Sequence, residues 1–526
     1  MVKVPGASAP IPLRRERKLP MPPVSAALGM AAAYYGYPLF NSVSRGQYLL
    51  PALLFLLIAA VSFFRVLCLP FYGKNDGGNV PPLLLKINIL VIAAAVGFTL
   101  GIASRRTVPG PAEMGLPADR VTAVSGILRE DPRSLNSGSG MGILELRTCA
   151  AQGGLRASAR GSITVFFPAE SIPRLKEFGR GSEIYADGVL VAGAGDKGVL
   201  DRGVLFRAVS LHVVKPAPPL ETFRTGLRTA LVEKFRSRGS SSPPVWGSLA
   251  SALLLGVRND LDTELTGAFR NSGCAHVLAL SGMHLAIISG ILAFFLRRPL
   301  GIRWASLVGA VFILLYVFVA GSQPSLVRAA IMYLIAVFAL WGLLKGKVLS
   351  LLGMAFIIQL VFQSETGTSL SFILSYLAMG GILTLGETLR ALFRGRLPEI
   401  INGALCASLG AFILTAPVVV YYFGTLKPIG ILAGLVVVPL SSLFMILSLA
   451  ALAAAFMPFP LWNILDFVLS ALYRFLEFIV SLAGRVPGFN VSNPAPVLVI
   501  SLFLWLLILF IRRQDRLGRN SVAPLD

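Results

Sequence analysis

Long apolar segments recur along most of this chain, and they constrain its fold more than any other feature. A helix needs about 20 largely apolar residues to cross the hydrocarbon core of a bilayer. Near the N-terminus the segments are 24–40, 48–69 and 83–103. In the C-terminal half they are 245–257 (too short to span), 273–296, 304–321, 324–344, 348–362, 370–385, 401–423, 429–456, 461–484 and 496–511. The sequence therefore predicts a polytopic α-helical membrane protein with about 11–12 transmembrane helices.

The composition agrees with this prediction, because only 14% of the 526 residues are charged and 55% are hydrophobic. A soluble domain has about 25% charged residues. The 47 Lys and Arg residues outnumber the 25 Asp and Glu residues, which gives a net charge of +22. Such a surplus marks the cytoplasmic loops of a membrane protein, and it also suits a path for a polyanion. Composition does not separate these two interpretations.

Cysteine and histidine are too few and too scattered to predict a metal site. The four cysteines form no C-x-x-C pair and are interpreted as isolated apolar residues. Three histidines in the whole sequence argue against a multi-histidine metal hydrolase. The sequence also contains no G-x-x-x-x-G-K-[ST] loop for ATP hydrolysis. We therefore expect no metal, no cofactor and no catalytic residues, and we do not expect an enzyme.

Residues 105–219 differ from the rest, because charge returns and apolar residues alternate in short runs. Such runs, bounded by Gly, Pro, Ser and Asp, are typical of strands. The predicted strands are 121–128, 142–148, 162–167, 183–191 and 204–214. This pattern favours a small β-barrel of the OB type, with a generic β-sandwich as the alternative.

A basic amphipathic helix is predicted at residues 220–240. Phe223, Leu227, Leu231 and Phe235 recur at a spacing of four, with Arg and Lys between them. Such a helix suits either the membrane surface or packing against the β domain. The sequence leaves both placements open.

The distribution of basic residues predicts the orientation in a bacterial cytoplasmic membrane. The basic tail at 1–23 is assigned to the cytoplasm, so the three helices within 24–104 bring the β domain to the extracytoplasmic side. In the membrane domain at 241–512, alternate loops are basic and the others carry little charge. The basic positions assigned to the cytoplasm are Lys74, Arg297, Arg298, Arg303, Lys345, Lys347, Arg390, Arg394, Arg396 and the tail at 513–526. Both termini are therefore predicted to be cytoplasmic.

Residues 267–290 place polar side chains inside an apolar span. His276, Ser281 and His284 fall within it, and Gly282 permits local unwinding. Polar side chains and non-helical backbone are costly in lipid unless protein or water covers them. These four residues are therefore candidates for lining a channel. Close packing of helices through small residues is the alternative, and spacing alone slightly favours it.

Arg328 is another channel-lining candidate, because Pro324 predicts a helix start that places it about one turn inside a helix. It would meet phosphates at the mouth of a conduit or snorkel to the interface. Ser371, Ser375 and Tyr376 lie near one another on a later helix and complete the candidate lining.

Two further groups of residues suit contacts with nucleic acid. Tyr421 and Tyr422 are interpreted as belt residues at the membrane interface, with base stacking as the alternative. In the β domain, the candidate DNA contacts are Arg129, Arg133, Arg147, Arg156 and Arg160. Basic grooves with exposed aromatic side chains hold single strands on OB folds, although aromatic residues are sparse in these strands.

Several stretches, in this order, resemble the ComEC family of competence proteins. They are A-L-L-L-G-V-R at 252–258, F-R-N-S-G-C-A-H-V-L-A-L-S-G-M-H-L at 269–285, G-S-Q-P-S-L-V-R-A-A-I-M at 321–332, L-S-F-I-L-S-Y-L-A at 370–378 and P-V-V-V-Y-Y-F-G at 417–424. The resemblance covers residues 24–511. It differs at Gly434, where the family often has Asn, and at Glu365-Thr366-Gly367, where a Pro is common.

This resemblance implies a cytoplasmic-membrane channel that passes single-stranded DNA inward during natural transformation. Many family members carry a C-terminal domain like a metallo-β-lactamase, but this sequence has no H-x-H-x-D-H run, so we expect no nuclease activity from it alone. The expected partners are single-stranded DNA, the lipid bilayer, a separate nuclease, a DNA receptor and a cytoplasmic translocase. The alternatives are a small-solute or ion transporter and a membrane-anchored module that binds nucleic acid.

Overall fold

The computed structural model describes residues 23–40, positions between 93 and 100, most of 113–258, and residues 260–342, 348–454 and 461–521. The chain divides into two compact units, Met1–Ile102 and Ala103–Asp526. In the first unit, the first predicted helix is α1 (Pro23–Phe40). The predicted span at 48–69, most of the one at 83–103 and the basic tail at 1–22 lie outside the described residues.

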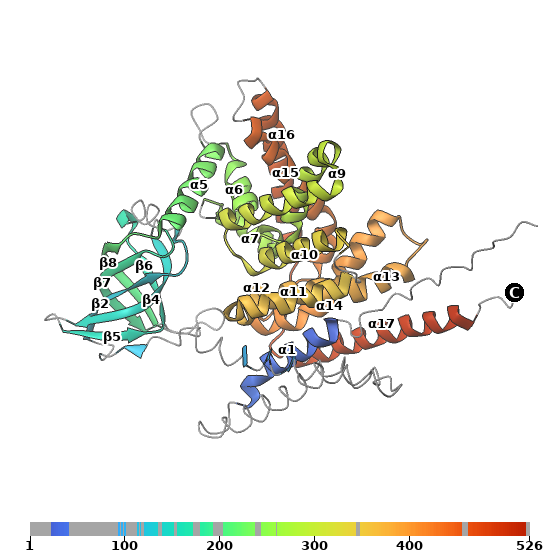
Figure 1. Cartoon of the computed structure of the whole chain (residues 1–526), viewed down its shortest axis with the longest axis horizontal. Helices are drawn as coiled ribbons and strands as arrows, with labels where there is room; N and C mark the ends of the chain where they lie inside the picture. The colour runs from blue at the N-terminus through green and yellow to red at the C-terminus, as the bar shows by residue number, and fades with distance from the viewer. Residues whose placement is uncertain are drawn as a thin grey trace, which may run out of the picture. The chain divides into compact units, whose positions relative to one another are not determined.

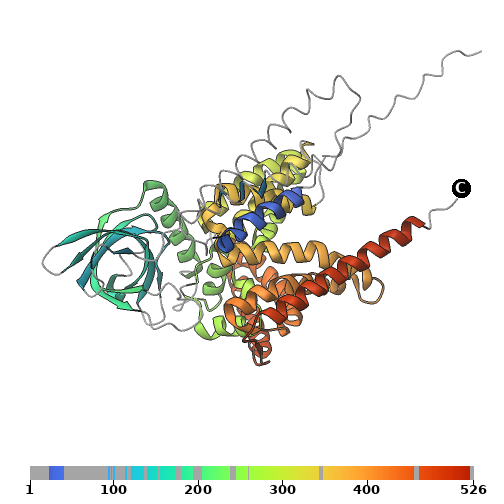
Figure 2. The ribbon, with the colours of Figure 1, turned by 90° about the horizontal axis from the view of Figure 1, so that it is seen from below.

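Five strands of the second unit close into a barrel, which Figure 2 shows end-on. They are β2 (Val121–Leu128), β4 (Gly140–Ala151), β6 (Ser162–Phe167), β7 (Glu183–Ala192) and β8 (Val204–Lys215). The circuit runs β2–β4–β6–β8–β7–β2, and only the β6–β8 pair is parallel. This is the strand order of the OB fold. The prediction of a small barrel is therefore confirmed, and the β-sandwich alternative is wrong.

Two glycines let the barrel strands bend enough to close. Gly126 and Gly188 lie where the strand register shifts. A Cβ atom at either position would come within 2.0 Å of a carbonyl oxygen on the neighbouring strand. Glycine is therefore required at both bends. Side chains that alternate along the strands fill the interior, and the fully buried ones include Val124, Leu144, Val165, Ile184 and Phe206.

Short elements extend the barrel sheet. They are the strands β1 (Glu113–Met114), β3 (Arg133–Ser134) and β5 (Arg156–Arg160). The 3-10 turn η2 (Ala169–Ser171) follows β6 and is not part of the sheet. The sequence does not predict β5, because Arg-Ala-Ser-Ala-Arg contains no apolar run. It forms because it continues the hairpin of β4, pairing Thr148 with Ser158.

Helices make up the rest of the described part of the second unit (Figure 1). The first are α5 (Pro219–Arg236), α6 (Gly247–Leu255), α7 (Thr263–Asn271) and the single turn α8 (Ala275–Leu278). The longer ones are α9 (Gly282–Ala320), α10 (Pro324–Leu340), α11 (Val348–Phe362), α12 (Leu370–Gly381), α14 (Glu399–Phe423), α15 (Ile429–Ala454), α16 (Leu461–Gly484) and α17 (Ala495–Ser521). Between them lie η3 (Ser364–Thr368), the π-helix η4 (Ile382–Gly386), α13 (Glu387–Leu392), and the paired strands β9 (Thr425–Leu426) and β10 (Phe489–Asn490).

Helix α9 is two helices joined at a kink. Pro299 lies inside it, and Gly301 has non-helical angles of φ 72° and ψ 163°. Proline removes a helical hydrogen bond, and glycine tolerates positive φ, so the break follows from this short sequence. The sequence correctly separates two apolar segments here. The first of them begins later than predicted, at Gly282 rather than at residue 273.

Helix α5 packs against the barrel, which is one of its two predicted placements. Asp131, in the turn after β2, accepts hydrogen bonds from Arg224 Nη2 at 2.9 Å and from Arg228 Nη1 at 2.8 Å. Arg228 Nη2 also donates to the Leu255 carbonyl oxygen of α6, at 2.9 Å. Burial alone would raise the pKa of Asp131, but the Arg224 and Arg228 guanidinium groups hold it below its ordinary value of 3.8.

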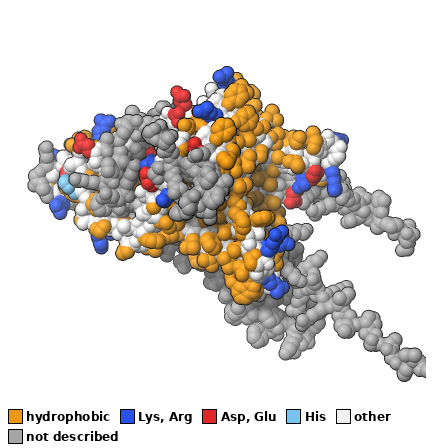
Figure 3. Space-filling view, turned by 90° about the horizontal axis from the view of Figure 1, so that it is seen from above, with side chains coloured by type: hydrophobic (Ala, Val, Ile, Leu, Met, Phe, Trp, Pro, Cys, Tyr) orange, Lys and Arg blue, Asp and Glu red, His pale blue; other side chains and the backbone are white. Residues whose placement is uncertain are grey.

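The helical region has the apolar surface that a lipid solvent requires. Among the described residues, five helices are long and apolar enough to cross a membrane, and three shorter apolar helices accompany them. No more than 33% of the residues in any of the five apolar windows are buried within the protein. Figure 3 shows hydrophobic side chains over much of this region on one face. These features fit a multi-pass helical membrane protein.

The core of the helical region lies among α6, α7, α15 and α16. Trp246, Phe269, Phe444 and Leu476 are each fully buried there. The indole Nε1 of Trp246 donates to the Asp466 carboxylate at 2.8 Å. A buried indole needs such a partner, so this bond fixes α16 against the start of α6.

Candidate functional site

The helix break between α8 and α9 organises the candidate site. The sequence places His276, Ser281 and His284 in one span, but α8 ends at Leu278 and the backbone is extended at Ala279 and Ser281. Ser281 then caps α9: its Oγ accepts from the Met283 N–H at 3.3 Å. The apolar segment predicted at 273–296 is therefore interrupted just before Gly282, where the sequence permits local unwinding, and capping of the new helix compensates for the break.

His284 completes this cap in the role that Glu or Gln usually plays. The Ser281 N–H donates to His284 Nδ1 at 3.0 Å, so Nδ1 carries no proton and Nε2 carries it. His284 is fully buried, and its Nε2 has no hydrogen-bond partner within the described part of the chain. A buried donor without a partner is costly, so this imidazole is available to a group that the described part of the chain does not supply.

Arg328 lies in the first turns of α10, as the sequence predicts, and only 5% of its surface is exposed. Its Nη1 donates to the Ser375 carbonyl oxygen at 2.6 Å, and its guanidinium carbon lies 5.8 Å from the centre of the Tyr376 ring. Among the described residues, no carboxylate forms an ion pair with Arg328, and its Nε has no partner. Arg328 therefore does not snorkel to an interface.

Gly282 and Arg328 are close neighbours across α9 and α10. A Cβ atom on Gly282 would lie 3.4 Å from Arg328 Nη2. The break at the start of α9 therefore brings bare backbone against the buried guanidinium. Four of the predicted lining residues, Gly282, Arg328, Ser375 and Tyr376, meet here.

A chain of hydrogen bonds fixes the neighbouring helices around Arg328. Tyr376 Oη donates to Gln359 Oε1 at 2.8 Å, and Gln359 Nε2 donates to the Pro324 carbonyl oxygen at 2.9 Å. Ser325 Oγ donates to the Leu280 carbonyl oxygen in the helix break, at 2.5 Å. These bonds tie α12 to α11, α11 to α10, and α10 to the break. We call Ser281, His284, Gln359, Arg328 and Tyr376 the polar cluster.

The sequence alone misses two residues of this hydrogen-bond chain, Gln359 and Ser325. Gln359 is fully buried and Ser325 is nearly so. The available signal is that Gln359 is the only strongly polar side chain in the apolar run of α11, and an isolated polar residue in such a run needs a partner. Ser325 gives no such signal, because Ser is common near helix starts.

The other two predicted lining residues lie outside the polar cluster. His276 is exposed on α8, and Ser371 is exposed in the first turn of α12. Between Ser371 and Tyr376, the ring of Phe372 packs against Tyr376 with ring centres 4.7 Å apart. The three serine and tyrosine candidates on α12 therefore do not share one environment.

The basic residues of the barrel are partly neutralised. Arg129 pairs with Glu145 at 3.0 Å, and Arg147 pairs with Glu183 at 3.2 Å. Arg156 and Arg160 are exposed on β5. Arg133 lies in β3, but its side chain is outside the described residues. The barrel therefore presents less free positive charge than the sequence suggests.

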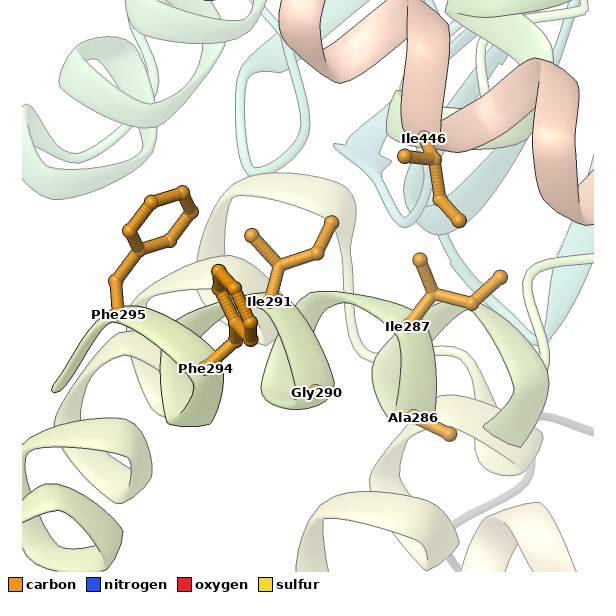
Figure 4. A pocket seen from close by; sticks show the side chains of 7 residues that line it. All are labelled: Ala286, Ile287, Gly290, Ile291, Phe294, Phe295 and Ile446. Carbon is orange, nitrogen blue, oxygen red and sulfur yellow. The ribbon is translucent and has the colours of Figure 1, made fainter. Parts of the chain in front are cut away.

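A separate, largely apolar hollow of about 310 Å³ lies between α9 and α15 (Figure 4). Its lining residues are Ala286, Ile287, Gly290, Ile291, Phe294, Phe295 and Ile446. No polar side chain points into it, so it offers nothing to a phosphate or another charged group.

Comparison with known proteins adds an independent line of evidence. Residues 253–516 match the family model described as competence protein, and this range includes the whole polar cluster. The chain is 28% identical to ComE operon protein 3 of Bacillus subtilis over 52% of its length, and 27% identical to competence protein ComA of Neisseria gonorrhoeae over 50%. It is also 26% identical to an uncharacterized protein of Aquifex aeolicus over 57% of its length.

The alignments cover only part of the named relatives. They span 35% of the Bacillus protein and 38% of the Neisseria protein, against 68% of the Aquifex protein. No solved structure matches this chain. The family model nevertheless covers half of the sequence and the helices that carry the polar cluster. The chain belongs to the competence protein family, in its ComEC branch.

Proposed function

We propose that this protein is a cytoplasmic-membrane channel for uptake of single-stranded DNA in natural transformation. The observation that carries the proposal is the buried guanidinium of Arg328, which has no carboxylate partner among the described residues. A buried unpaired charge is strongly unfavourable. The phosphodiester backbone would supply the missing negative charge each time a phosphate passes.

The polar cluster suits a substrate that is recognised by its backbone. Arg328 offers a cation, and His284 offers an unused Nε2–H donor from the adjoining helix start. Phosphate contacts of this kind position a strand without reading its sequence. The bare backbone at Gly282 leaves space beside the guanidinium. His276, Ser281, Ser371, Ser375 and Tyr376 remain candidates for the rest of the lining.

The orientation and partners belong to the same proposal. The distribution of basic residues supports an extracytoplasmic barrel and cytoplasmic termini. In that orientation the exposed arginines of β5 would meet incoming DNA before the polar cluster does. The matching family model and one relative are named for competence, which supports work alongside a DNA receptor, a nuclease and a cytoplasmic translocase.

One observation favours a second candidate, a small-solute transporter. Discontinuous helices that present backbone groups to a substrate are typical of secondary transporters, and the chain has a helix break between α8 and α9. A transporter would carry a small anion, and its transport rate would saturate as the anion concentration rises. A DNA channel would carry a linear polyanion but not free phosphate.

Transformation with linear marked DNA in the native host tests the proposal. We expect deletion to abolish transformants while DNA stays bound at the cell surface. A normally expressed Arg328→Gln protein should restore far fewer transformants than wild type, since the cation is lost. Arg394→Gln removes an exposed arginine after α13 and serves as the matched control. Undiminished transformation in the deletion strain would contradict the proposal.

A further inference from the structure

Three segments that are distant in sequence meet at one end of the helical region. Strand β9, between α14 and α15, pairs with β10, between α16 and α17, and Phe489 is opposite Leu426. The turn between α7 and α8 joins them, because a Cβ atom on Gly273 would lie 3.0 Å from the Gly430 Cα atom. These contacts build a small surface from parts of three loops.

Positive charge collects on this surface. Lys427 follows β9, and its Nζ donates to Asn271 Oδ1 of α7 at 2.9 Å. Its side-chain stem is packed on Gly488, where a Cβ atom would lie 3.0 Å from Lys427 Cγ. Arg270 is exposed in the same last turn of α7. The lysine is therefore held in place beside a second cation rather than extended freely into solvent.

The two cations repel each other. Partial burial lowers the pKa of Lys427, and the neighbouring Arg270 guanidinium lowers it further. In the described ranges, no Asp or Glu forms an ion pair with Arg270 or Lys427. A third cation, Arg485, is exposed directly after Gly484, and Gly484 lies against Asn271. An anion bound among these cations would relieve the repulsion.

Exposed aromatic side chains belong to the segments on either side of these cations in the chain, the end of α14 and strand β10. Phe489 on β10 is 65% exposed, and a polar loop follows it. Tyr421, in the last turn of α14 before β9, is 71% exposed. Exposed rings next to cations are how sequence-tolerant sites hold single strands, because every base has a face that can stack. We call Arg270, Lys427, Arg485, Phe489 and Tyr421 the β9–β10 platform.

The charge distribution makes lipid headgroups a poorer occupant. On the predicted orientation this end is extracytoplasmic, where basic residues are disfavoured in loops. Anionic lipids attract basic segments chiefly at the cytoplasmic leaflet. Three cations gathered on the opposite side therefore need another anion to explain them.

The platform is also next to the polar cluster along the chain. Only the turn at Gly273 and the single helical turn α8 separate Arg270 from the break at Ser281. His276 is exposed on α8 between them. Few residues therefore separate the platform from the helix break, so a DNA strand bound at the platform would next meet Ser281 and Arg328.

We propose that the β9–β10 platform binds single-stranded DNA at the outer mouth of the channel, with its cations on phosphates and its rings on bases. This rests on the proposed function for its biological meaning, but binding to the platform can be measured without transport. The platform is separate from the barrel, so the two would hold successive parts of one strand.

Fluorescence anisotropy with a labelled oligothymidylate tests the platform on the purified full-length protein in nanodiscs. For single strands, the slope of log affinity against log salt changes by about 0.7 for each phosphate contact. Arg270→Gln combined with Lys427→Gln should therefore flatten the slope by about 1.4. The matched control is Arg394→Gln combined with Arg396→Gln, which removes two exposed charges elsewhere and should leave the slope unchanged.

The stacking contact has its own variant. Phe489→Leu keeps an apolar side chain but removes the ring, and should weaken binding on the order of tenfold without changing the salt slope. Phe478→Leu, at a ring 61% exposed on α16, should bind as wild type does. Unchanged affinity and slope in both platform variants would overturn the inference.

Two further results separate this inference from the proposed function. In an Arg328→Gln background, which lowers transformation, the platform double variant should still flatten the salt slope by about 1.4. If the double variant lost binding to phosphatidylglycerol vesicles but kept its oligonucleotide affinity and slope, the platform would be a lipid contact and the inference would be wrong. If platform binding held while a deletion strain transformed normally, the channel proposal alone would fail.

Discussion

At the scale of single residues, the polar cluster is held by hydrogen bonds that leave some capacity unused. Arg328 donates a hydrogen bond to the Ser375 carbonyl oxygen, and its guanidinium lies near the Tyr376 ring. His284 Nδ1 accepts the hydrogen bond of the helix cap, and Nε2 has no hydrogen-bond partner among the described residues. Fully satisfied clusters rigidify a core. Partly satisfied ones are expected where a substrate completes them, which agrees with a polyanion passing at this point.

Gln359 is predicted to stabilise this arrangement. Gln359→Leu removes the hydrogen bonds that Gln359 makes with the Tyr376 hydroxyl and the Pro324 carbonyl oxygen. Hydrogen bonds between membrane helices contribute about 0.6 kcal/mol each on average. We therefore expect the free energy of unfolding to fall by about 1 kcal/mol, measured by thermal unfolding in detergent. Gln363→Leu is the matched control, because Gln363 Oε1 is buried without a partner. Equal stability of the two variants would refute this role.

The sequence identifies four of the five residues of the polar cluster, and it misses Gln359. Arg328, Ser281 and His284 stand out because polar side chains in apolar segments are costly. Their meeting with Ser375 and Tyr376 depends on how α10 packs on α12, which no local pattern encodes. Ser325 is missed because its partner, the Leu280 carbonyl oxygen, exists only once the helix breaks.

At the scale of secondary-structure elements, α5 joins the barrel to the helical region. Arg224 and Arg228 of α5 converge on Asp131 in the barrel turn, and Arg228 continues to the end of α6. The same helix leaves Leu220 and Phe223 exposed, at 64% and 65%. Its packing therefore uses the charged face, which explains why apolar periodicity alone left the placement open.

Asp131→Asn is predicted to weaken this junction. The amide cannot pair with two guanidinium groups, and a hydrogen bond to a charged group is worth about 1.5–3 kcal/mol. We expect the loss to appear as faster hydrogen exchange at the start of α5. Arg129→Gln, which removes an ion pair elsewhere on the barrel, is the control and should leave that exchange unchanged.

The same junction predicts a dependence on pH. The pKa of Asp131 is lower in the folded protein than its ordinary value of 3.8. The ion pairs therefore add stability above about pH 4 and lose it as the pH falls through the lower, folded-state pKa. Below pH 4, the protection of the α5 amides from hydrogen exchange, relative to the intrinsic rate at each pH, should fall in the wild type. In Asp131→Asn, this protection should not fall any further. The same acid-induced loss of protection in both proteins would contradict this assignment.

Strands and spans were predictable to different degrees. The strands Val121–Leu128 and Ser162–Phe167 match their predicted limits, because alternating burial marks both ends. The span predicted from residue 273 is interrupted instead, because Ser281 supplies a cap that an apolar average does not register. Averaged hydropathy predicts the length of an apolar segment well, but it does not detect a helix break that a capping residue stabilises.

At the scale of the whole molecule, the described parts combine a closed barrel with an apolar helical region of the competence protein family. The family match spans the helices from α6 to α17 and excludes the barrel. We therefore propose that DNA passes through the helical region and that the barrel captures it. The exposed apolar surface requires lipid around the helices, so any path for phosphates must be enclosed by them.

The most direct test of the channel is strand entry into liposomes that contain the purified protein. Labelled DNA is added outside, external nuclease removes what has not entered, and the protected label is counted. The account predicts protected single strands with wild-type protein, far fewer with Arg328→Gln, and almost none when the same sequence is a duplex. No protection above empty liposomes, or equal protection of duplex and single strands, would contradict it.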